Sequence, residues 1–130
     1  MDSKFYVSLE AARLLKEKGY DRECIAYYQN GEFHPYSVDL FKLSINDKNA
    51  APPYMNQYSA PTKAEAIDWL DSKGIIIEVL QDYRGLWFYV IKISETESYL
   101  SESDDKYFST RLEAEEAAII KACELLENGN

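Results

Sequence analysis

The stretch TKAEAIDWLDSKGIIIEVLQDYRGLWFYVIKI, residues 62–93, carries the clearest structural signals in this chain of 130 residues. It opens with a capping box, in which Thr62 and Glu65 each accept a hydrogen bond from the backbone N–H of the other. Gly74 follows the last residue with helical spacing, as glycine commonly does just beyond a helix C-terminus. These signals predict a helix over 63–73.

Two apolar runs, 75–80 and 86–93, follow this helix and are separated by a short turn, which predicts an antiparallel hairpin. Pairing of Leu80 with Trp87 would give the hairpin two apolar faces. The first face then consists of Ile77, Val79, Phe88 and Val90, and the second of Ile76, Leu80, Trp87, Tyr89 and Ile91. Since both faces are apolar, we expect the hairpin to lie in the middle of a sheet and to be covered on both sides, at least in part.

Capping and spacing predict two further helices, over 9–18 and 111–127, and the second of these begins with another capping box at Thr110 and Glu113. A smaller hairpin is predicted around the pair Asn30-Gly31, which is typical of tight two-residue turns. The strands of that hairpin are 24–28 and 33–36, and two further candidate strands are 41–45 and 98–101.

Residues 46–61 lack periodicity and contain two adjacent prolines, so they predict a loop or hinge. This segment would join an N-terminal part, made of one helix and the smaller hairpin, to a C-terminal part with the order helix, hairpin, helix. A chain of this length is expected to form one domain. Together the elements predict a single α+β domain over 1–130. It would contain an antiparallel sheet of three to five strands with about three helices packed on it.

The charge balance argues against a nucleic-acid-binding protein. Fourteen basic and 23 acidic side chains give a formal net charge of −9, which disfavours a broad phosphate-binding surface. The order of elements from Thr62 onward is shared with double-stranded-RNA-binding domains. Those domains begin their last helix with basic residues, whereas the last predicted helix here begins with acidic ones. We therefore expect no direct contact with nucleic acid.

The sequence also indicates the compartment. No run approaches the roughly 18 apolar residues of a membrane span, and the N-terminus lacks the apolar segment of a signal peptide. Cys24 and Cys123 are isolated from each other in the sequence. Isolated cysteines in a chain without an export signal are usually reduced thiols. We expect a cytoplasmic protein with no membrane association.

Residues suited to catalysis or metal binding are few. One histidine and two cysteines are too few for a metal site rich in His or Cys. Cys24 and His34 could act as nucleophile and base across the smaller hairpin, but their flanking residues do not suggest an oxyanion hole. Paired carboxylates such as Asp104-Asp105 lie where solvated charge is usual. We predict no catalytic residue, cofactor or metal, and a small enzyme of unrecognised type is an alternative.

Tyrosines in the less regular part of the chain are candidate partner contacts, because tyrosine gives much contact area for little rotamer entropy. The simpler interpretation is that tyrosine is a good strand residue with its hydroxyl in water. The candidates are Tyr27, Tyr28, Tyr54 and Tyr58.

Acidic residues concentrate near the C-terminus, where residues 95–127 contain ten acidic and three basic side chains. Such a face could bind a basic partner or imitate the phosphates of nucleic acid. The simpler interpretation is a solvated helix face that keeps the protein soluble. The candidate contacts on this helix are Glu113, Glu115 and Glu116.

The apolar hairpin also suggests self-association. If three helices cannot cover both faces of the sheet, aromatic area around Trp87 and Tyr89 would stay exposed. Large exposed apolar patches usually mark interfaces, and two-fold dimers are the commonest closed assembly. We therefore predict a homodimer with Trp87 or Tyr89 near the contact.

Two segments, VSLEAARLLKEKGYD from Val7 and APTKAEAIDWLDSKGIIIEVL from Ala60, resemble small uncharacterised proteins of phages and integrated elements in gut Bacteroidetes. The shared residues are helix caps and core positions, so the resemblance implies a cellular context and no activity. We expect a non-enzymatic accessory protein of a phage or mobile element that acts through protein contacts. An acidic mimic of nucleic acid that inhibits a host DNA-binding protein is the alternative.

Overall fold

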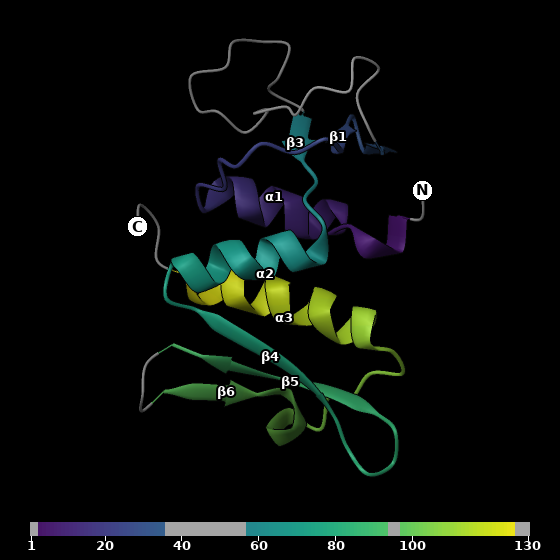
Figure 1. Cartoon of the computed structure of the whole chain (residues 1–130), viewed down its shortest axis with the longest axis vertical. Helices are drawn as coiled ribbons and strands as arrows, with labels where there is room; N and C mark the ends of the chain where they lie inside the picture. The colour runs from purple at the N-terminus through teal and green to yellow at the C-terminus, as the bar shows by residue number, and fades with distance from the viewer. Residues whose placement is uncertain (1–2, 36–56, 94–96, 127–130) are drawn as a thin grey trace.

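A computed structural model describes residues 3–35, 57–93 and 97–126, and this part of the chain confirms the predicted α+β class (Figure 1). Its helices are α1 (Leu9–Glu17), α2 (Lys63–Ser72) and α3 (Arg111–Leu125), with short 3-10 turns η1 (Ser3–Phe5) and η3 (Ser101–Asp104). Its strands are β1 (Tyr27–Gln29), β2 (Glu32–His34), β3 (Gln57–Ser59), β4 (Ile76–Gln81), β5 (Trp87–Lys92) and β6 (Ser98–Leu100).

The predicted N-caps at Thr62 and Thr110 are both present, and the reciprocal capping box forms at Thr62. Thr62 Oγ1 accepts the backbone N–H of Glu65 at 3.1 Å, and Glu65 Oε1 accepts the N–H of Thr62 at 2.9 Å. At the start of α3, Thr110 Oγ1 accepts the N–H of Glu113 at 3.2 Å. Each bond satisfies a first-turn N–H that the helix itself leaves without a partner.

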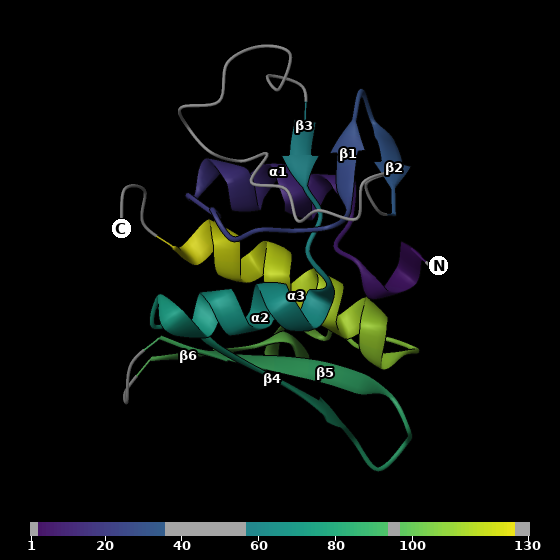
Figure 2. The same ribbon diagram turned by 45° about the horizontal axis from the view of Figure 1, so that its top comes forward.

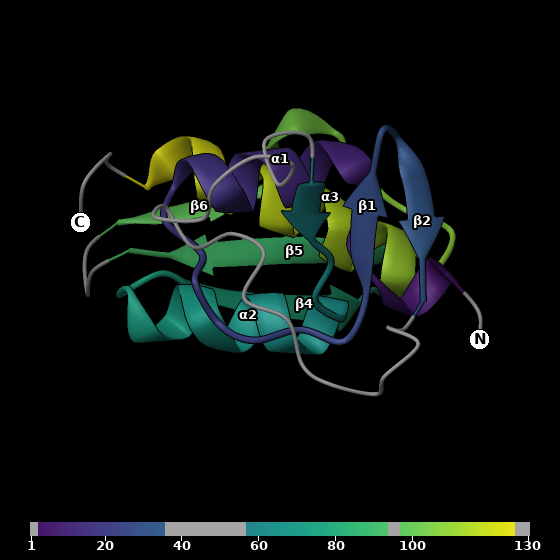
Figure 3. The same cartoon turned by 90° about the horizontal axis from the view of Figure 1, so that it is seen from above.

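The strands form two antiparallel sheets of three strands each, with the orders β2-β1-β3 and β4-β5-β6. Figures 1 and 2 show the larger sheet on one side of α2 and α3, with α1 and the smaller sheet on the other side. Figure 3 shows the strands of the smaller sheet lying above the helices. The helices therefore form a layer between the two sheets.

The predicted pairing of Leu80 with Trp87 is wrong by one residue, because Leu80 pairs with Phe88 and Gln81 with Trp87. The cause is the turn. The N–H of Asp82 donates to the Leu86 carbonyl at 2.8 Å, which leaves a three-residue loop that ends on Gly85 at φ 86°. Three-residue hairpin loops commonly end on a glycine in this left-handed conformation.

A shift of one residue exchanges the two faces of one strand relative to the other. Ile77, Tyr89 and Ile91 consequently share the face against the helices, where they are 8%, 7% and 0% exposed. Ile76 and Leu80 lie on the opposite face, and each is 43% exposed. The helices therefore cover one face, while the other is covered only in part, with Phe88, Val90 and Leu100 half-buried. The hairpin does not lie in the middle of its sheet, because β4 is an edge strand in the order β4-β5-β6.

The smaller sheet contains the predicted hairpin and one strand that was not predicted. Asn30 and Gly31 both have positive φ, 51° and 84°, as a type I′ turn requires. Residues 57–59, predicted as part of the 46–61 loop, instead form β3, which pairs with β1. The predicted strand 41–45 and residues 46–56 of that loop lie outside the described residues.

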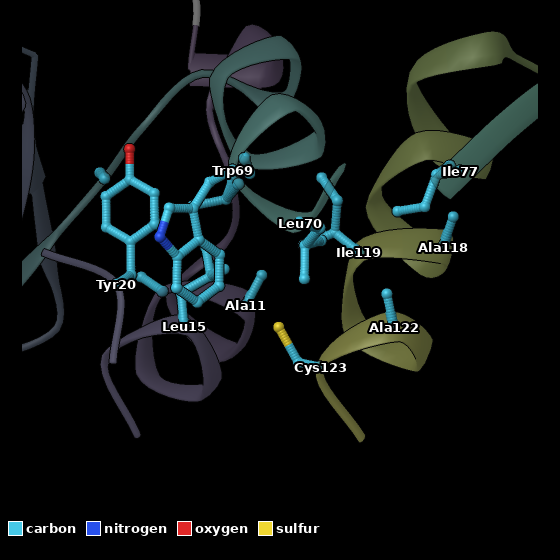
Figure 4. Close-up of a cluster of buried hydrophobic side chains, with 14 of the residues drawn as sticks. Ala11, Leu15, Tyr20, Trp69, Leu70, Ile77, Ala118, Ile119, Ala122 and Cys123 are labelled. Carbon is cyan, nitrogen blue, oxygen red and sulfur yellow. The ribbon is translucent and has the colours of Figure 1, made fainter. Parts of the chain in front are cut away.

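The core lies among the three helices and draws on both sheets. Trp69 of α2 faces Tyr20, with ring centroids 5.2 Å apart in an edge-to-face arrangement (Figure 4). Leu15 of α1 and Ile119 of α3 are fully buried in the same cluster. Because this cluster contains side chains from α1, α2, α3, β1, β4 and β5, these elements pack around one interior.

Candidate functional site

One face of the larger sheet combines apolar side chains with exposure. Directly paired residues lie on the same face of an antiparallel sheet, so the register places Phe88 beside Leu80 and Leu100 beside Val90. Among these side chains the Glu78 carboxylate and the Lys92 ammonium form an exposed ion pair at 2.7 Å. We call this surface the outer face, and its apolar members are Ile76, Leu80, Phe88, Val90 and Leu100.

The β4–β5 turn lies at one end of the larger sheet and presents an aromatic side chain to solvent. Tyr83 at its tip is 96% exposed. The Arg84 guanidinium lies 4.5 Å from the ring centroid of Tyr107 and 5.9 Å from that of Tyr83. Asp82 fixes the turn, since its carboxylate accepts the Arg84 Nε–H at 3.0 Å and the Leu86 backbone N–H at 3.1 Å. The turn is therefore held in one conformation by its own hydrogen bonds.

Sequence reasoning missed Tyr83 and Arg84 as candidate contacts. The available signal was their position: a tyrosine in a tight turn between two strands has no core to enter. Tyr and Arg are the residue types that most often dominate binding energy at protein interfaces. The structure shows that the two side chains also lie beside each other at the end of the outer face.

The predicted tyrosine contacts lie in three different settings. Tyr28 is buried, and its hydroxyl donates to the Val7 carbonyl at 2.7 Å, so it belongs to the core. Tyr27 is half-buried and stacks on His34 at 4.8 Å. Tyr58 is half-buried beneath the ammonium of Lys16, 5.1 Å from its ring centroid. Tyr54 lies outside the described residues.

The predicted dimer contacts Trp87 and Tyr89 lie on the helix side of the sheet, not on the outer face. Tyr89 is 7% exposed, its N–H donates to Ser101 Oγ at 2.9 Å, and its ring stacks on Phe108 at 6.2 Å. Trp87 is half-buried and exchanges two backbone hydrogen bonds of 2.8 Å with Phe108. The exposed apolar area that was expected around them is instead carried by the outer face.

The three predicted acidic contacts each bind a side chain of this chain. Glu116 accepts both the N–H and the hydroxyl of Ser8, and so joins α3 to the N-terminus of α1. Glu113 accepts the Thr110 hydroxyl at 3.0 Å. Glu115 lies 3.4 Å from the guanidinium of Arg111 one turn earlier. These internal contacts leave the helix less suited to present a regular row of free negative charges.

A groove of about 780 Å³ runs beside the N-terminal half of α3. We call it the α3 groove. Its apolar lining residues are Phe108, Leu112, Ala117 and Ile120. Its polar lining residues are Lys4, Lys63, Thr110, Arg111, Glu113 and Glu116. A neighbouring hollow of about 500 Å³ shares Lys63, Arg111 and Leu112 with it. The structure thus brings the acidic residues of α3 together with three basic ones.

The cysteines are free thiols, and both are buried. Burial raises the pKa of the Cys24 thiol to about 11 and that of Cys123 to about 12, so both are protonated near neutral pH. A protonated thiol is a poor nucleophile. Cys24 Sγ contacts the Tyr20 hydroxyl at 3.7 Å, while His34 stacks on Tyr27. These contacts give no support to a Cys24–His34 catalytic pair.

The described residues contain neither a cluster of metal ligands nor a membrane-spanning helix. In residues 3–35, 57–93 and 97–126, no three His, Cys, Asp or Glu side chains are grouped closely enough to hold a metal ion. Within the same ranges, no helix has the length and apolar character needed to cross a bilayer.

Comparison with known proteins adds no assignment: no family model, no curated protein and no solved structure matches the chain.

Proposed function

We propose that this chain is a non-enzymatic accessory protein that binds another protein through its outer face. The observation that carries the proposal is the exposure of Ile76 and Leu80, each 43%, on a sheet face that ends at the β4–β5 turn with its exposed Tyr83. Apolar side chains exposed together on one surface usually mark an interaction site.

The proposed site has the features of a surface prepared for binding. Its strands are already hydrogen-bonded on the helix-backed sheet, and the turn is fixed by Asp82, so little conformational entropy would be lost on association. Phe88 and Leu80 form an apolar centre, and Tyr83 and Arg84 at one end are residue types that often contribute most to binding energy. The Glu78–Lys92 pair supplies polar groups that fix the orientation of a partner.

The proposed context is the cytoplasm of a bacterium that carries a phage or mobile element. It is supported by the resemblance of the segments beginning at Val7 and Ala60 to proteins of such elements, and by the two free thiols. The net charge of −9 supports a protein partner rather than nucleic acid. The same charge on two copies opposes self-association, so we propose a partner other than a second copy of this chain.

Leu80→Glu should lower the amount of partner captured from a host lysate by at least about tenfold. Burying an unpaired carboxylate costs more than the about 1.4 kcal/mol that corresponds to a tenfold change. Ile25→Glu is the matched control, because Ile25 is a similarly exposed aliphatic residue, at 36%, outside the larger sheet. Quantitative mass spectrometry of the captured proteins measures both variants against the unaltered chain.

Capture should persist at about 0.5 M salt, where the Debye length is about 4 Å, because the contact is mainly apolar. Equal capture by Leu80→Glu and Ile25→Glu would refute the outer face as the site. Release by salt, with DNA-binding proteins among the captured species, would favour the acidic mimic instead. Sedimentation of the purified chain as a dimer would show that a second copy occupies the face.

A further inference from the structure

The α3 groove places a largely buried lysine side chain beside an apolar wall. Lys63 lines both the groove and the neighbouring hollow, and it is only 7% exposed. Phe108, Leu112 and Ile120 form the wall, with Phe108 held in place by its stacking on Tyr89. Pockets that bind small molecules typically have about 300–1,000 Å³ of mostly apolar volume with a few placed polar groups. At about 780 Å³ the groove falls in this range.

Lys63 is the unusual member of the groove. A lysine is rarely this buried unless its charge is compensated. Its ammonium donates to the carbonyl of Lys4, which uses one of its three N–H donors. No carboxylate of the described ranges 3–35, 57–93 and 97–126 forms an ion pair with it. An anion entering the groove would supply the missing countercharge.

The other charged side chains of the groove limit how much negative charge a ligand can carry. Lys4 and Arg111 line the groove together with Glu113 and Glu116, and Arg111 also pairs with Glu115 at 3.4 Å. Both acids already accept hydrogen bonds, from Thr110 and Ser8. Figures 1 and 2 show the N-terminal ends of α2 and α3 near each other beside η1, and helix N-termini add partial positive charge.

We propose that the α3 groove binds a small amphiphilic monocarboxylate, with the carboxylate at Lys63 and the apolar body against Phe108, Leu112 and Ile120. One carboxylate can accept from Lys63, whereas a dianion would bring a second negative charge close to Glu113 and Glu116. The groove lies on the helix side of the larger sheet. This ligand site is therefore separate from the outer face, and loss of binding at one site would not change binding at the other.

Titration of the full ¹⁵N-labelled chain with decanoate and with 1-decanol, both below micelle-forming concentrations, tests this site. Decanoate should shift the amide signals of Phe108, Leu112 and Ile120 and should bind at least about tenfold more tightly than the uncharged decanol. Lys63→Met keeps the length of the side chain and removes its charge, so it should weaken decanoate binding by a similar factor and leave decanol binding unchanged. Lys73→Met, at the exposed C-terminal end of α2, is the matched control.

Equal affinities for decanoate and decanol on the unaltered chain would overturn the proposal without any variant. Unchanged decanoate binding by Lys63→Met, with a retained amide spectrum, would do the same. Shifts confined to residues of the outer face would also contradict it, since they would place the amphiphile on the other side of the sheet.

Discussion

Replacing Trp69 with alanine should lower the free energy of unfolding by about 3–5 kcal/mol, the range for deleting a buried aromatic side chain. Trp69 is 2% exposed and contacts Tyr20 edge to face at 5.2 Å. Its removal would leave a cavity between α1 and α2 that the rigid neighbouring helices cannot fill. Urea unfolding monitored by circular dichroism measures the change.

The control for this variant is Tyr83→Ala, which removes an aromatic side chain that is 96% exposed. It should change the free energy of unfolding by no more than about 0.5 kcal/mol, as surface substitutions usually do. A loss below about 1 kcal/mol for Trp69→Ala would contradict its place in the core.

Glu116→Ala should lower the free energy of unfolding by about 2–3 kcal/mol, because hydrogen bonds to charged groups contribute about 1.5–3 kcal/mol each and are partly redundant here. The Glu116 carboxylate accepts the N–H of Ser8 at 3.0 Å and the Ser8 hydroxyl as well. Ser8 Oγ in turn accepts the N–H of Ala11 at 3.2 Å as the N-cap of α1. Loss of the carboxylate would therefore loosen the start of α1 as well as its contact with α3.

Glu124→Ala is the matched control, since Glu124 lies exposed on the same helix. We expect it to change the free energy of unfolding by less than about 0.5 kcal/mol. Equal stabilities of the two variants would mean that the Ser8 contact contributes little, and Glu116 would again be available as a partner contact.

The parts of the fold that depend on local sequence could be predicted. The capping box at Thr62 and the N-cap bond at Thr110 each join residues three positions apart, and the Asn30-Gly31 turn needs only two adjacent residues. Each has an energetic preference that does not depend on the rest of the molecule. Helix positions and the smaller hairpin therefore follow from the sequence.

The parts that depend on distant contacts could not be predicted. Gln57 and Ser59 are polar, so β3 has no apolar alternation, and its pairing with β1 and burial became visible only in the structure. The contact between Ser8 and Glu116 joins residues 108 positions apart. Because the sequence does not reveal that contact, it predicts Glu116 to be a solvent-exposed charge on the helix surface.

The outer face shows how one local error changes a candidate site. The sequence indicates correctly that the 75–93 hairpin has apolar residues on both faces. The turn, however, contains one residue fewer than the predicted pairing of Leu80 with Trp87 needs. The predicted pairing therefore placed Trp87 and Tyr89 on the exposed face, whereas the structure places Leu80 and Phe88 there. Turn geometry sets register, and register decides which side chains reach solvent.

Site-specific photo-crosslinking at Leu80 shows whether the outer face contacts another protein in the cell. A benzophenone-bearing phenylalanine analogue placed at Leu80, and separately at Ile25, is irradiated in host cells, and adducts of the 15.0 kDa chain are identified by mass. The proposed docking surface predicts one discrete adduct with a different protein from Leu80 and none from Ile25. No adduct from Leu80, equal adducts from both positions, or an adduct of two copies of this chain would contradict it.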